Sequence, residues 1–267
     1  MRLFDAHNHL QDERLAPFAQ DVKRQTESVA GMVVNGSCEE DWPAVLELAR
    51  TRPNVLPSFG YHPWYVRERT DNWQLELVKH LDCIPSAVGE VGLDRWIADP
   101  DLAAQEECFL AQMRLAAERD LPVSIHCLKA WGWLYDLLQR GPRPAVGFLL
   151  HSYGGPQEMI QPLVRLGAYF SLPGYFAHER KARQRETFRH IPRDRLLCET
   201  DAPDQLLPEE RNRFPLIDPS SGRPLNHPGN IEAVYELMAE ILQMSVSDWA
   251  IQAEENFGRL FGRCCHR

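Results

Sequence analysis

Short apolar segments recur along the whole chain and alternate with segments of helical periodicity. Each apolar run is rich in Val, Ile, Leu or Phe and is bounded by Gly, Pro, Asn or a polar residue, as buried parallel strands are. The eight runs cover residues 2–7, 31–36, 54–60, 86–92, 122–127, 145–152, 168–174 and 195–201. Helical spacing of apolar residues marks 41–50, 71–81, 101–120, 131–140, 156–167 and 230–244. Such alternation predicts parallel strands joined by right-handed crossovers.

Eight strand-helix units predict a closed (β/α)8 barrel, the TIM-barrel form of the α/β class. A length of 267 residues suits this fold, because barrels of about 250 residues form a single unit. No composition shift or low-complexity tract marks a boundary, so we predict one domain over residues 1–267. An open doubly wound sheet is the structural alternative.

The charge balance and the apolar pattern limit the partners of the chain. Lys and Arg number 29 against 38 Asp and Glu, which gives a net charge of -9 and argues against a protein that coats nucleic acid with positive charge. No stretch approaches the roughly 18 consecutive apolar residues of a membrane span, and the N-terminus lacks the apolar core of a signal peptide. Seven scattered cysteines without C-x-x-C spacing indicate reduced thiols. We therefore expect a cytoplasmic protein, monomeric by default, with no membrane partner.

Ionisable residues gather where the predicted strands end, which is where (β/α)8 enzymes build their active sites. His7 and His9 lie two residues apart at the end of the first strand, so both side chains point to the same side of the sheet. A carboxylate interrupts the apolar run 86–92, and its burial costs free energy unless it is paired or binds a metal. The six residues at these strand ends are His7, His9, Glu90, His126, His151 and Asp201.

Each of these residues alone has an ordinary structural explanation, such as a salt bridge for Glu90 or a turn for Asp201. Together they offer four imidazoles and two carboxylates, which is more than one tetrahedral zinc requires. The set suits two divalent ions about 3.5 to 4 Å apart, with Glu90 and a water as bridges. Imidazole donors favour Zn, Ni or Mn over Mg.

The motifs that contain these residues resemble those of the TatD family of metal-dependent deoxyribonucleases, within the metallo-dependent hydrolase superfamily of barrels. They are DAHNHL (5–10), GYHPW (60–64), GEVGLD (89–94), PVSIHC (122–127), HSYGG (151–155) and ETDAP (199–203), and they span nearly the whole chain. The resemblance implies that the six strand-end residues are the metal ligands and that Mg supports a nuclease activity. It also implies that His62 either faces the substrate or supports the ligands from outside, rather than acting as a primary ligand, and that Asp94 orients a histidine ligand.

Three positions depart from the family pattern and bear on substrate preference. The family has an Arg two residues after the histidine that matches His126, whereas this chain has Lys129 one place later. Tyr153 stands in the aromatic place of the family's H-C-F-S-G, and Asn226-His227-Pro228 replaces Asn-Glu-Pro. We predict His62, Lys129 and Tyr153 as substrate-binding residues.

These motifs predict a divalent-metal-dependent hydrolase that cleaves phosphodiester bonds in DNA, exonucleolytically, by a metal-activated water. Asp201 and Glu90 are the predicted catalytic residues, with Asp201 accepting or orienting the proton of the water. One alternative is an amidohydrolase or lactonase acting on a small carboxylic ester or amide, because the same water would attack a carbonyl. A catalytically inactive metal-binding scaffold is the other, although it would not require both carboxylates.

Three further segments lie outside these motifs. Residues 177–195 hold seven Lys and Arg against three Asp and Glu, a local charge of +4 that would contact a nucleic-acid backbone or simply face water. The Pro-rich segment 204–229 is expected to lie over the C-terminal face of the barrel, and Trp64, Tyr153 and Tyr175 are candidates for stacking bases. The RCCHR tail (263–267) holds potential metal ligands, but chain ends are usually poorly ordered and we predict no site there.

Overall fold

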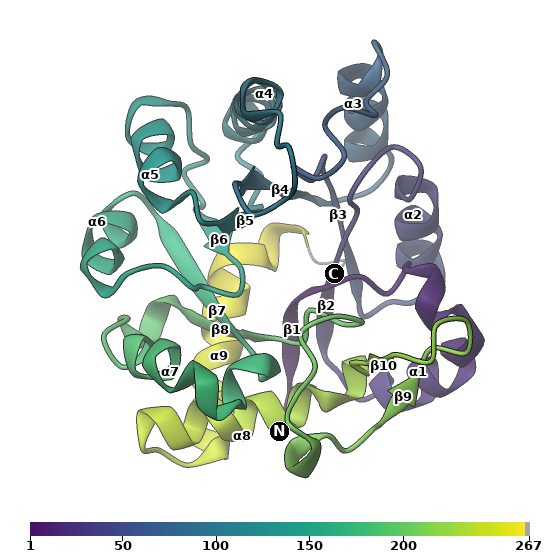
Figure 1. The fold of residues 1–267 in the computed structure, drawn as a ribbon, viewed down its shortest axis with the longest axis vertical. Coiled ribbons are helices and arrows are strands. Elements are labelled where there is room, and N and C mark those ends of the chain that lie inside the picture. Colours follow the sequence, from purple (N-terminus) through teal and green to yellow (C-terminus); the bar gives the residue numbers. More distant parts are fainter. Residues whose placement is uncertain (265–267) are drawn as a thin grey trace.

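The computed structural model describes residues 1–264 and shows eight parallel strands in a barrel with helices around it (Figure 1). The strands neighbour one another in chain order, which confirms the predicted (β/α)8 barrel and excludes the doubly wound sheet. They are β1 (Phe4–Asn8), β2 (Gly31–Asn35), β3 (Val55–Phe59), β4 (Ala87–Asp94), β5 (Val123–Leu128), β6 (Phe148–Leu150), β7 (Ala168–Pro173) and β8 (Leu196–Glu199). The helices are α1 (Ala19–Thr26), α2 (Trp42–Thr51), α3 (Trp73–Cys83), α4 (Leu102–Arg119), α5 (Trp131–Arg140), α6 (Ile160–Arg165), α7 (Ala182–Phe188), α8 (Ile231–Leu242) and α9 (Val246–Phe261).

Local sequence signals explain the clearest helix, α4. The Asp101 side chain accepts a hydrogen bond from the backbone N–H of Ala104 and so caps the first turn. The buried face includes Cys108, Phe109 and Met113, which follow the helical period. Asp120 ends the helix in a left-handed conformation, which Asp tolerates better than most residues. The predicted segment 101–120 therefore contains the whole helix.

The barrel closes between β1 and β8 through a seam of backbone and side-chain hydrogen bonds. The N–H of Asp201 donates to the carbonyl of His7 at 2.9 Å, and the N–H of His9 donates to the carbonyl of Ala202 at 2.8 Å. Within the seam, the buried Asp5 carboxylate accepts the backbone N–H and the hydroxyl of Thr200. These bonds hold the end of β1 against the end of β8, which places their ionisable residues side by side.

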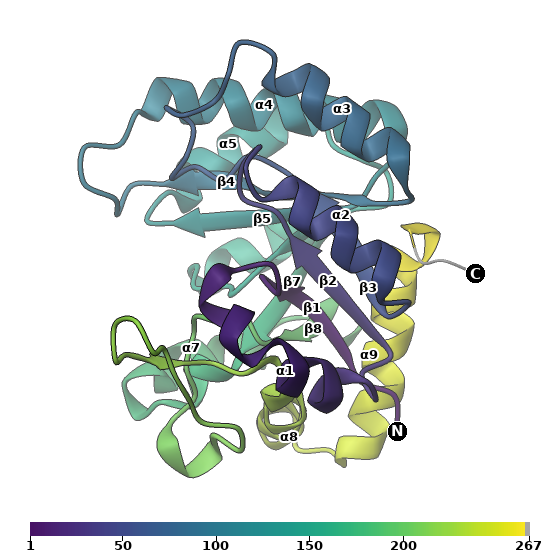
Figure 2. The same ribbon diagram turned by 90° about the vertical axis from the view of Figure 1, so that its right-hand side faces the viewer.

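Helix α9 lies across the N-terminal ends of the strands (Figure 2). Its Phe257, Leu260 and Phe261 join barrel residues such as Val33 and Leu149 in one apolar cluster. Burial of each large side chain contributes about 1.5 to 3 kcal/mol, so the helix is a substantial part of the core. Because α9 covers the N-terminal end, the interior of the described barrel is open to ligands at the opposite, C-terminal end.

The structure differs from the sequence expectations in several helices and in the sixth strand. Helices α1, α7 and α9 were not predicted as helices, and the expected helix 156–167 is a 3-10 turn at Gln157–Met159 followed by α6. The sixth strand is shorter than expected because Gly147, with φ of 104°, turns the chain just before it. No helix within residues 1–264 combines the length and apolarity needed to cross a lipid bilayer.

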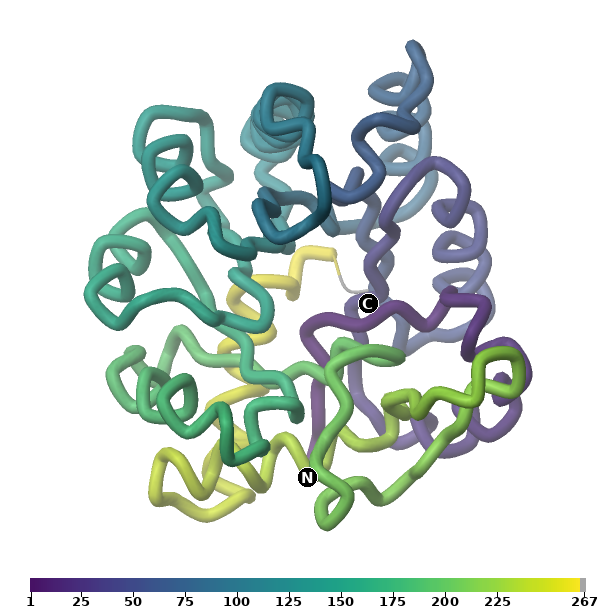
Figure 3. The backbone as a smooth tube through the Cα atoms, viewed as in Figure 1, coloured from purple at the N-terminus to yellow at the C-terminus, as the bar shows by residue number. Residues whose placement is uncertain are grey.

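The long segment 204–229 lies over the C-terminal end of the barrel, on the side of β1 and α1, as Figure 3 shows. It contains a short antiparallel pair, β9 (Leu216–Ile217) and β10 (Pro224–Leu225). Asn226 anchors the segment. Its backbone N–H donates to the carbonyl of Pro203, and its side-chain amide donates to the carbonyl of Thr200. The expected position of this segment beside the site is thus correct.

Candidate metal centre

Glu90 lies at the centre of the C-terminal face, surrounded by the rings of five histidines. Its side chain is 3% exposed, and its two carboxylate oxygens face different histidines. Oε2 lies 3.2 Å from Nε2 of His7 and 3.1 Å from Nε2 of His9. Oε1 lies 3.2 Å from Nε2 of His62, 3.1 Å from Nδ1 of His126 and 2.9 Å from Nε2 of His151. The nitrogens of His7 and His9 therefore face one oxygen of Glu90, and the nitrogens of the other three histidines face the second oxygen.

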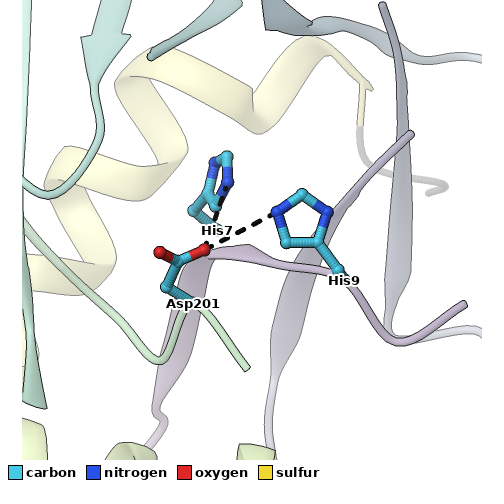
Figure 4. A group of neighbouring side chains, drawn as sticks. All are labelled: His7, His9 and Asp201. Atoms are coloured by element: carbon cyan, nitrogen blue, oxygen red, sulfur yellow. Dashed lines mark ion pairs between the residues drawn. The ribbon is translucent and has the colours of Figure 1, made fainter. Parts of the chain in front are cut away.

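Asp201 completes the group on the Oε2 side. Its Oδ1 lies 3.7 Å from Nε2 of His7 and 3.6 Å from Nε2 of His9, and the three side chains point toward one another (Figure 4). The ligand atoms of these three residues lie within 4.8 Å of one another, as do those of His7, Glu90 and His151. The structure thus brings together all six residues that the sequence singled out at strand ends.

Glycines beside Glu90 allow its strand to approach both neighbours closely. A Cβ at Gly89 would lie 2.8 Å from Cβ of Ser124 in β5, and a Cβ at Gly92 would collide with the carbonyl oxygen of His126. Gly92 is also the residue that faces His126 in the register of β4 and β5. The flanking glycines in GEVG therefore place Glu90 within reach of the histidines on either side.

Outer hydrogen bonds set the orientation of two of the imidazoles. Nδ1–H of His9 donates to the carbonyl of Asn35 at 2.8 Å, and Nε2–H of His126 donates to the Asp94 carboxylate at 3.0 Å. When these rings are neutral, their inner nitrogens carry lone pairs, which face Glu90 oxygens at 3.1 Å. A lone pair opposite an anionic oxygen is repulsive unless a proton or a metal cation lies between them. The donors therefore fit a divalent metal ion, with outer partners of the kind that orient metal-binding histidines.

His62 has the opposite orientation. Its Nδ1 accepts the backbone N–H of Trp64 at 3.2 Å, so in the neutral ring Nε2 carries the proton and donates to Oε1 of Glu90. The ring is buried, with the side chain 7% exposed. In this tautomer the residue holds Glu90. The ligand atoms of His62, Glu90 and His126 also lie within 4.8 Å of one another, so the assignment of His62 as a residue other than a primary ligand stays a prediction.

Burial and mutual charge shift the pKa values of the whole cluster. Burial disfavours the charged form of His9, but its hydrogen bond to Glu90 and the charges of Glu90 and Asp201 raise its pKa to about 9. Burial lowers the pKa of His7 and of His62 to about 4. Burial also raises the pKa of Asp201 to about 7, although His151 and His9 act in the opposite direction. Neighbouring ionisable side chains around Glu90 thus have widely separated pKa values, as is typical of acid-base sites.

Two of the three predicted substrate-binding residues have very different surroundings. Lys129 follows β5, is exposed, and has its Nζ 3.6 Å from the ring centre of Trp96. Tyr153 is 0% exposed, packs on Trp131 and Phe170, and donates its hydroxyl to the carbonyl of Pro156. A ring so enclosed offers no surface to a substrate, so the expectation for Tyr153 as a substrate contact or a stacking residue is corrected to a packing role.

The basic segment 177–195 is only partly available to a ligand. Arg185 donates to the carbonyls of Phe176, Ala177 and His178 and therefore stabilises the turn before α7. Arg180 and Lys181 lie over the ring of Tyr175, at 5.1 and 5.0 Å from its centre. Residues 265–267 of the RCCHR tail lie outside the described part of the chain.

Sequence reasoning missed several buried polar residues that support the site. Glu199 accepts hydrogen bonds from the backbone N–H and hydroxyl of Ser152 and from the hydroxyl of Ser171, and it lies 3.8 Å from Nδ1 of His151. The hydroxyl of Ser124 lies 2.7 Å from Nδ1 of His7. Their signal was a polar residue inside an apolar strand run, which is costly unless the group is hydrogen-bonded.

Comparison with known proteins agrees with the fold and with these motifs. The family model described as TatD related DNase matches residues 4–262. The 3'-5' ssDNA/RNA exonuclease TatD of Escherichia coli K12 is 31% identical over 270 residues, which cover 97% of this chain and 99% of that protein. An uncharacterized metal-dependent hydrolase of Bacillus subtilis, YabD, is 30% identical over 265 residues, which cover 97% and 98% of the two chains. The crystal structure of YjjV, a TatD homologue from Escherichia coli, superposes with a TM-score of 0.86 at 27% identity and covers 98% of both chains. The chain therefore belongs to the TatD-related DNase family and is a metal-dependent hydrolase.

Proposed function

We propose that this hydrolase cleaves phosphodiester bonds in single-stranded DNA, removing nucleotides from a chain end. The observation that carries the proposal is the Glu90 carboxylate, whose two oxygens face separate groups of nitrogen donors. Two neighbouring divalent ions are a recurring feature of sites that displace an oxygen at phosphorus, and the two oxygens of Glu90 would each be available to one ion. Relatives of similar length named as ssDNA/RNA exonucleases support the same substrate class.

The residues divide naturally between two divalent ions. His7, His9 and Asp201 with Oε2 of Glu90 would hold one ion, and His126 and His151 with Oε1 would hold the other. When bound, such ions supply Lewis acidity, which acidifies water and withdraws charge from the phosphoryl oxygens. Imidazole-rich donors favour Zn, Mn or Ni over Mg.

The protein side chains then perform the proton transfer and the positioning. Asp201 lies at the rim of the cluster with its side chain 10% exposed, so it can accept the proton of the attacking water and pass it to solvent. The buried Glu90 is held between the two groups, and the Nε2–H of His62 fixes the direction of its carboxylate. Lys129 provides a cation at the rim for a substrate phosphate.

Metal-free protein tests the proposal directly. Addition of Mg, Mn or Zn should restore cleavage of a single-stranded oligonucleotide and of an aryl phosphodiester. Hydrolysis of lactones or N-acyl compounds without phosphodiester cleavage would select the amidohydrolase alternative. Metal binding without hydrolysis of any of these substrates would select the scaffold alternative.

Asp201→Asn tests the assignment of the proton acceptor. General acid-base groups contribute about 100- to 10000-fold, so kcat should fall by that range in protein with its metal content verified. Asp204→Asn is a matched control, because Asp204 is exposed and forms an ion pair with Arg14 at 2.8 Å. Wild-type turnover in metal-loaded Asp201→Asn would show that the assignment is wrong.

A further inference from the structure

Two exposed tryptophans lie beside the metal centre and are tied to the same carboxylate. Trp64 follows β3 and is 54% exposed, and Trp96 follows β4 and is 62% exposed, whereas the other tryptophans of the chain are buried or half-buried. The Asp94 carboxylate accepts the indole N–H of Trp64 at 2.7 Å and the backbone N–H of Trp96 at 2.6 Å. A core-packing role does not explain large apolar rings that are held at the surface.

The indole of Trp64 is fixed in place close to the candidate ligands. Its ring centre lies 5.0 Å from that of His62 and 6.4 Å from that of His126, in edge-to-face contacts. The Asp94 oxygen that receives the indole N–H also receives Nε2–H of His126. An exposed ring with a fixed orientation loses little conformational entropy when a flat group stacks on it.

Trp96 has a different contact, because its ring holds the Lys129 ammonium. Nζ lies 3.6 Å from the ring centre, within the range of a cation-π interaction. The contact restrains a long, flexible side chain that follows His126 by three residues. An ammonium in this place matches the phosphate of a polynucleotide, whose backbone is recognised by such cations.

We propose that Trp64 stacks an unpaired base of the substrate while Lys129, held by Trp96, contacts a neighbouring phosphate. The proposal rests on the phosphodiesterase function proposed above and specifies its substrate class as a single-stranded polynucleotide with intact bases near the cleaved end. An unpaired base exposes its ring face to an aromatic side chain, whereas a base inside a duplex is covered by its neighbours. Trp64 and Lys129 are therefore specificity-determining residues for this site.

The preference for an intact over an abasic single-stranded oligonucleotide measures the stacking. Trp64→Ala should lower the ratio of the two kcat/KM values roughly 5- to 150-fold, the range of base-aromatic stacking. Trp64→Phe keeps a ring but loses the bond to Asp94, so it should retain most of the preference. Equal loss of the preference in Trp64→Ala and Trp64→Phe would overturn stacking in favour of a structural role through Asp94.

Salt dependence measures the phosphate contact. Lys129→Gln should reduce binding of intact and abasic oligonucleotides alike, and it should make the slope of log Kd against log salt shallower by about 0.7, as expected for one phosphate on a single strand. Leu75→Ala, an exposed apolar truncation on α3, should change neither quantity. An unchanged slope in Lys129→Gln would overturn the role of that residue.

Binding separates this proposal from the proposed function. The fluorescence of the exposed tryptophans should be quenched by an intact oligonucleotide more than by an abasic one in wild type, and the difference should vanish in Trp64→Ala. Quenching without cleavage in metal-loaded protein would refute the phosphodiesterase function and support the stacking surface. Cleavage without any preference between the two oligonucleotides would overturn the stacking surface and leave the function intact.

Discussion

Asp94→Asn is the substitution that best tests how the centre holds metal, because it keeps the shape of the side chain and removes its charge. Burial acts against the charge of Asp94, but hydrogen bonds from His126 and Trp64 outweigh it and lower its pKa to about 2. Asp94 is therefore a carboxylate that accepts three N–H groups, from His126, Trp64 and the Trp96 backbone. An amide has one accepting oxygen, so either the Trp96 N–H or the pair His126 and Trp64, which share Oδ2, loses its acceptor in the variant. In both cases the bond from His126 is no longer made to a charged group.

The geometry sets the size of the effect. A hydrogen bond to a charged group contributes about 1.5 to 3 kcal/mol. Loss of an outer partner of a metal-binding histidine typically weakens metal binding about 10- to 100-fold, which corresponds to about 1.4 to 2.7 kcal/mol. The two ranges overlap, and we expect about 2 kcal/mol weaker binding of the ion on the His126 side. In the proposed two-ion arrangement, the ion at His7, His9 and Asp201 would have no contact with Asp94, and its affinity should not change.

Titration of metal-free protein with Zn or Mn against a competing fluorescent chelator resolves the two binding steps. One step should weaken in Asp94→Asn while the other is unchanged. Asp99→Asn is a matched control on the same loop, since Asp99 is exposed and pairs with Arg67 at 3.1 Å. Wild-type affinity for both ions in a folded Asp94→Asn variant, or equal weakening in Asp99→Asn, would refute the argument.

Three other predictions follow from the structure. Removal of metal by a chelator should lower Tm by roughly 5 to 10 °C relative to protein with metal at 100 times its Kd, since such binding stabilises by about 2.7 kcal/mol; identical melting curves would contradict a metal site that forms only in the folded chain. Charge reversal at the exposed Arg180 and Arg183 should weaken cleavage of single-stranded DNA roughly tenfold near 0.1 M salt but spare a small phosphodiester, and equal loss on both substrates would count against a backbone contact there. Burial, opposed by Asp21, lowers the pKa of His227 to about 4, below its unfolded value near 6.5, so its neutral form contributes stability that is present above pH 6.5 and is lost as the pH falls toward 4. Between pH 7.5 and pH 5, the free energy of unfolding measured in urea should therefore fall by about 2 kcal/mol more in wild type than in His227→Gln. Equal falls in the two proteins would exclude this contribution.

Much of the fold was predictable because barrel strands are apolar on both faces. Such runs stand out even when they are short, and each of the eight predicted runs contains or overlaps the observed strand. The candidate ligands were predictable for a related reason. A carboxylate such as Glu90 in an apolar run is costly, so its presence there indicates a compensating partner that the sequence itself does not show.

The remainder depended on tertiary contacts that leave little local trace. Helix α9 carries a local signal, since the Ser245 side chain accepts the N–H of Asp248 and one face of the helix is apolar, but its position over the N-terminal end of the barrel depends on the tertiary contacts of Phe257 and Phe261. Tyr153 occupies a strand-end position like that of a site residue, yet its ring turns into the space between Trp131 and Phe170. Trp96 gave no signal at all, because the sequence does not show that Asp94 and Lys129 fix the loop and the ring beside it.

The histidines around Glu90 differ in their hydrogen-bond partners, which residue type alone does not predict. His62 and His126 are both histidines at strand ends, both lie about 3 Å from Oε1 of Glu90, and residue type alone gives them equal claims to a metal ion. Their outer partners are opposite in kind, because a backbone N–H faces Nδ1 of His62 whereas the Asp94 carboxylate faces Nε2 of His126. The first leaves a proton pointing at Glu90, and the second leaves a lone pair pointing there. In the proposed centre the same residue type would hold a carboxylate in one position and offer a metal ligand in the other, and the neighbouring hydrogen bonds would make the difference.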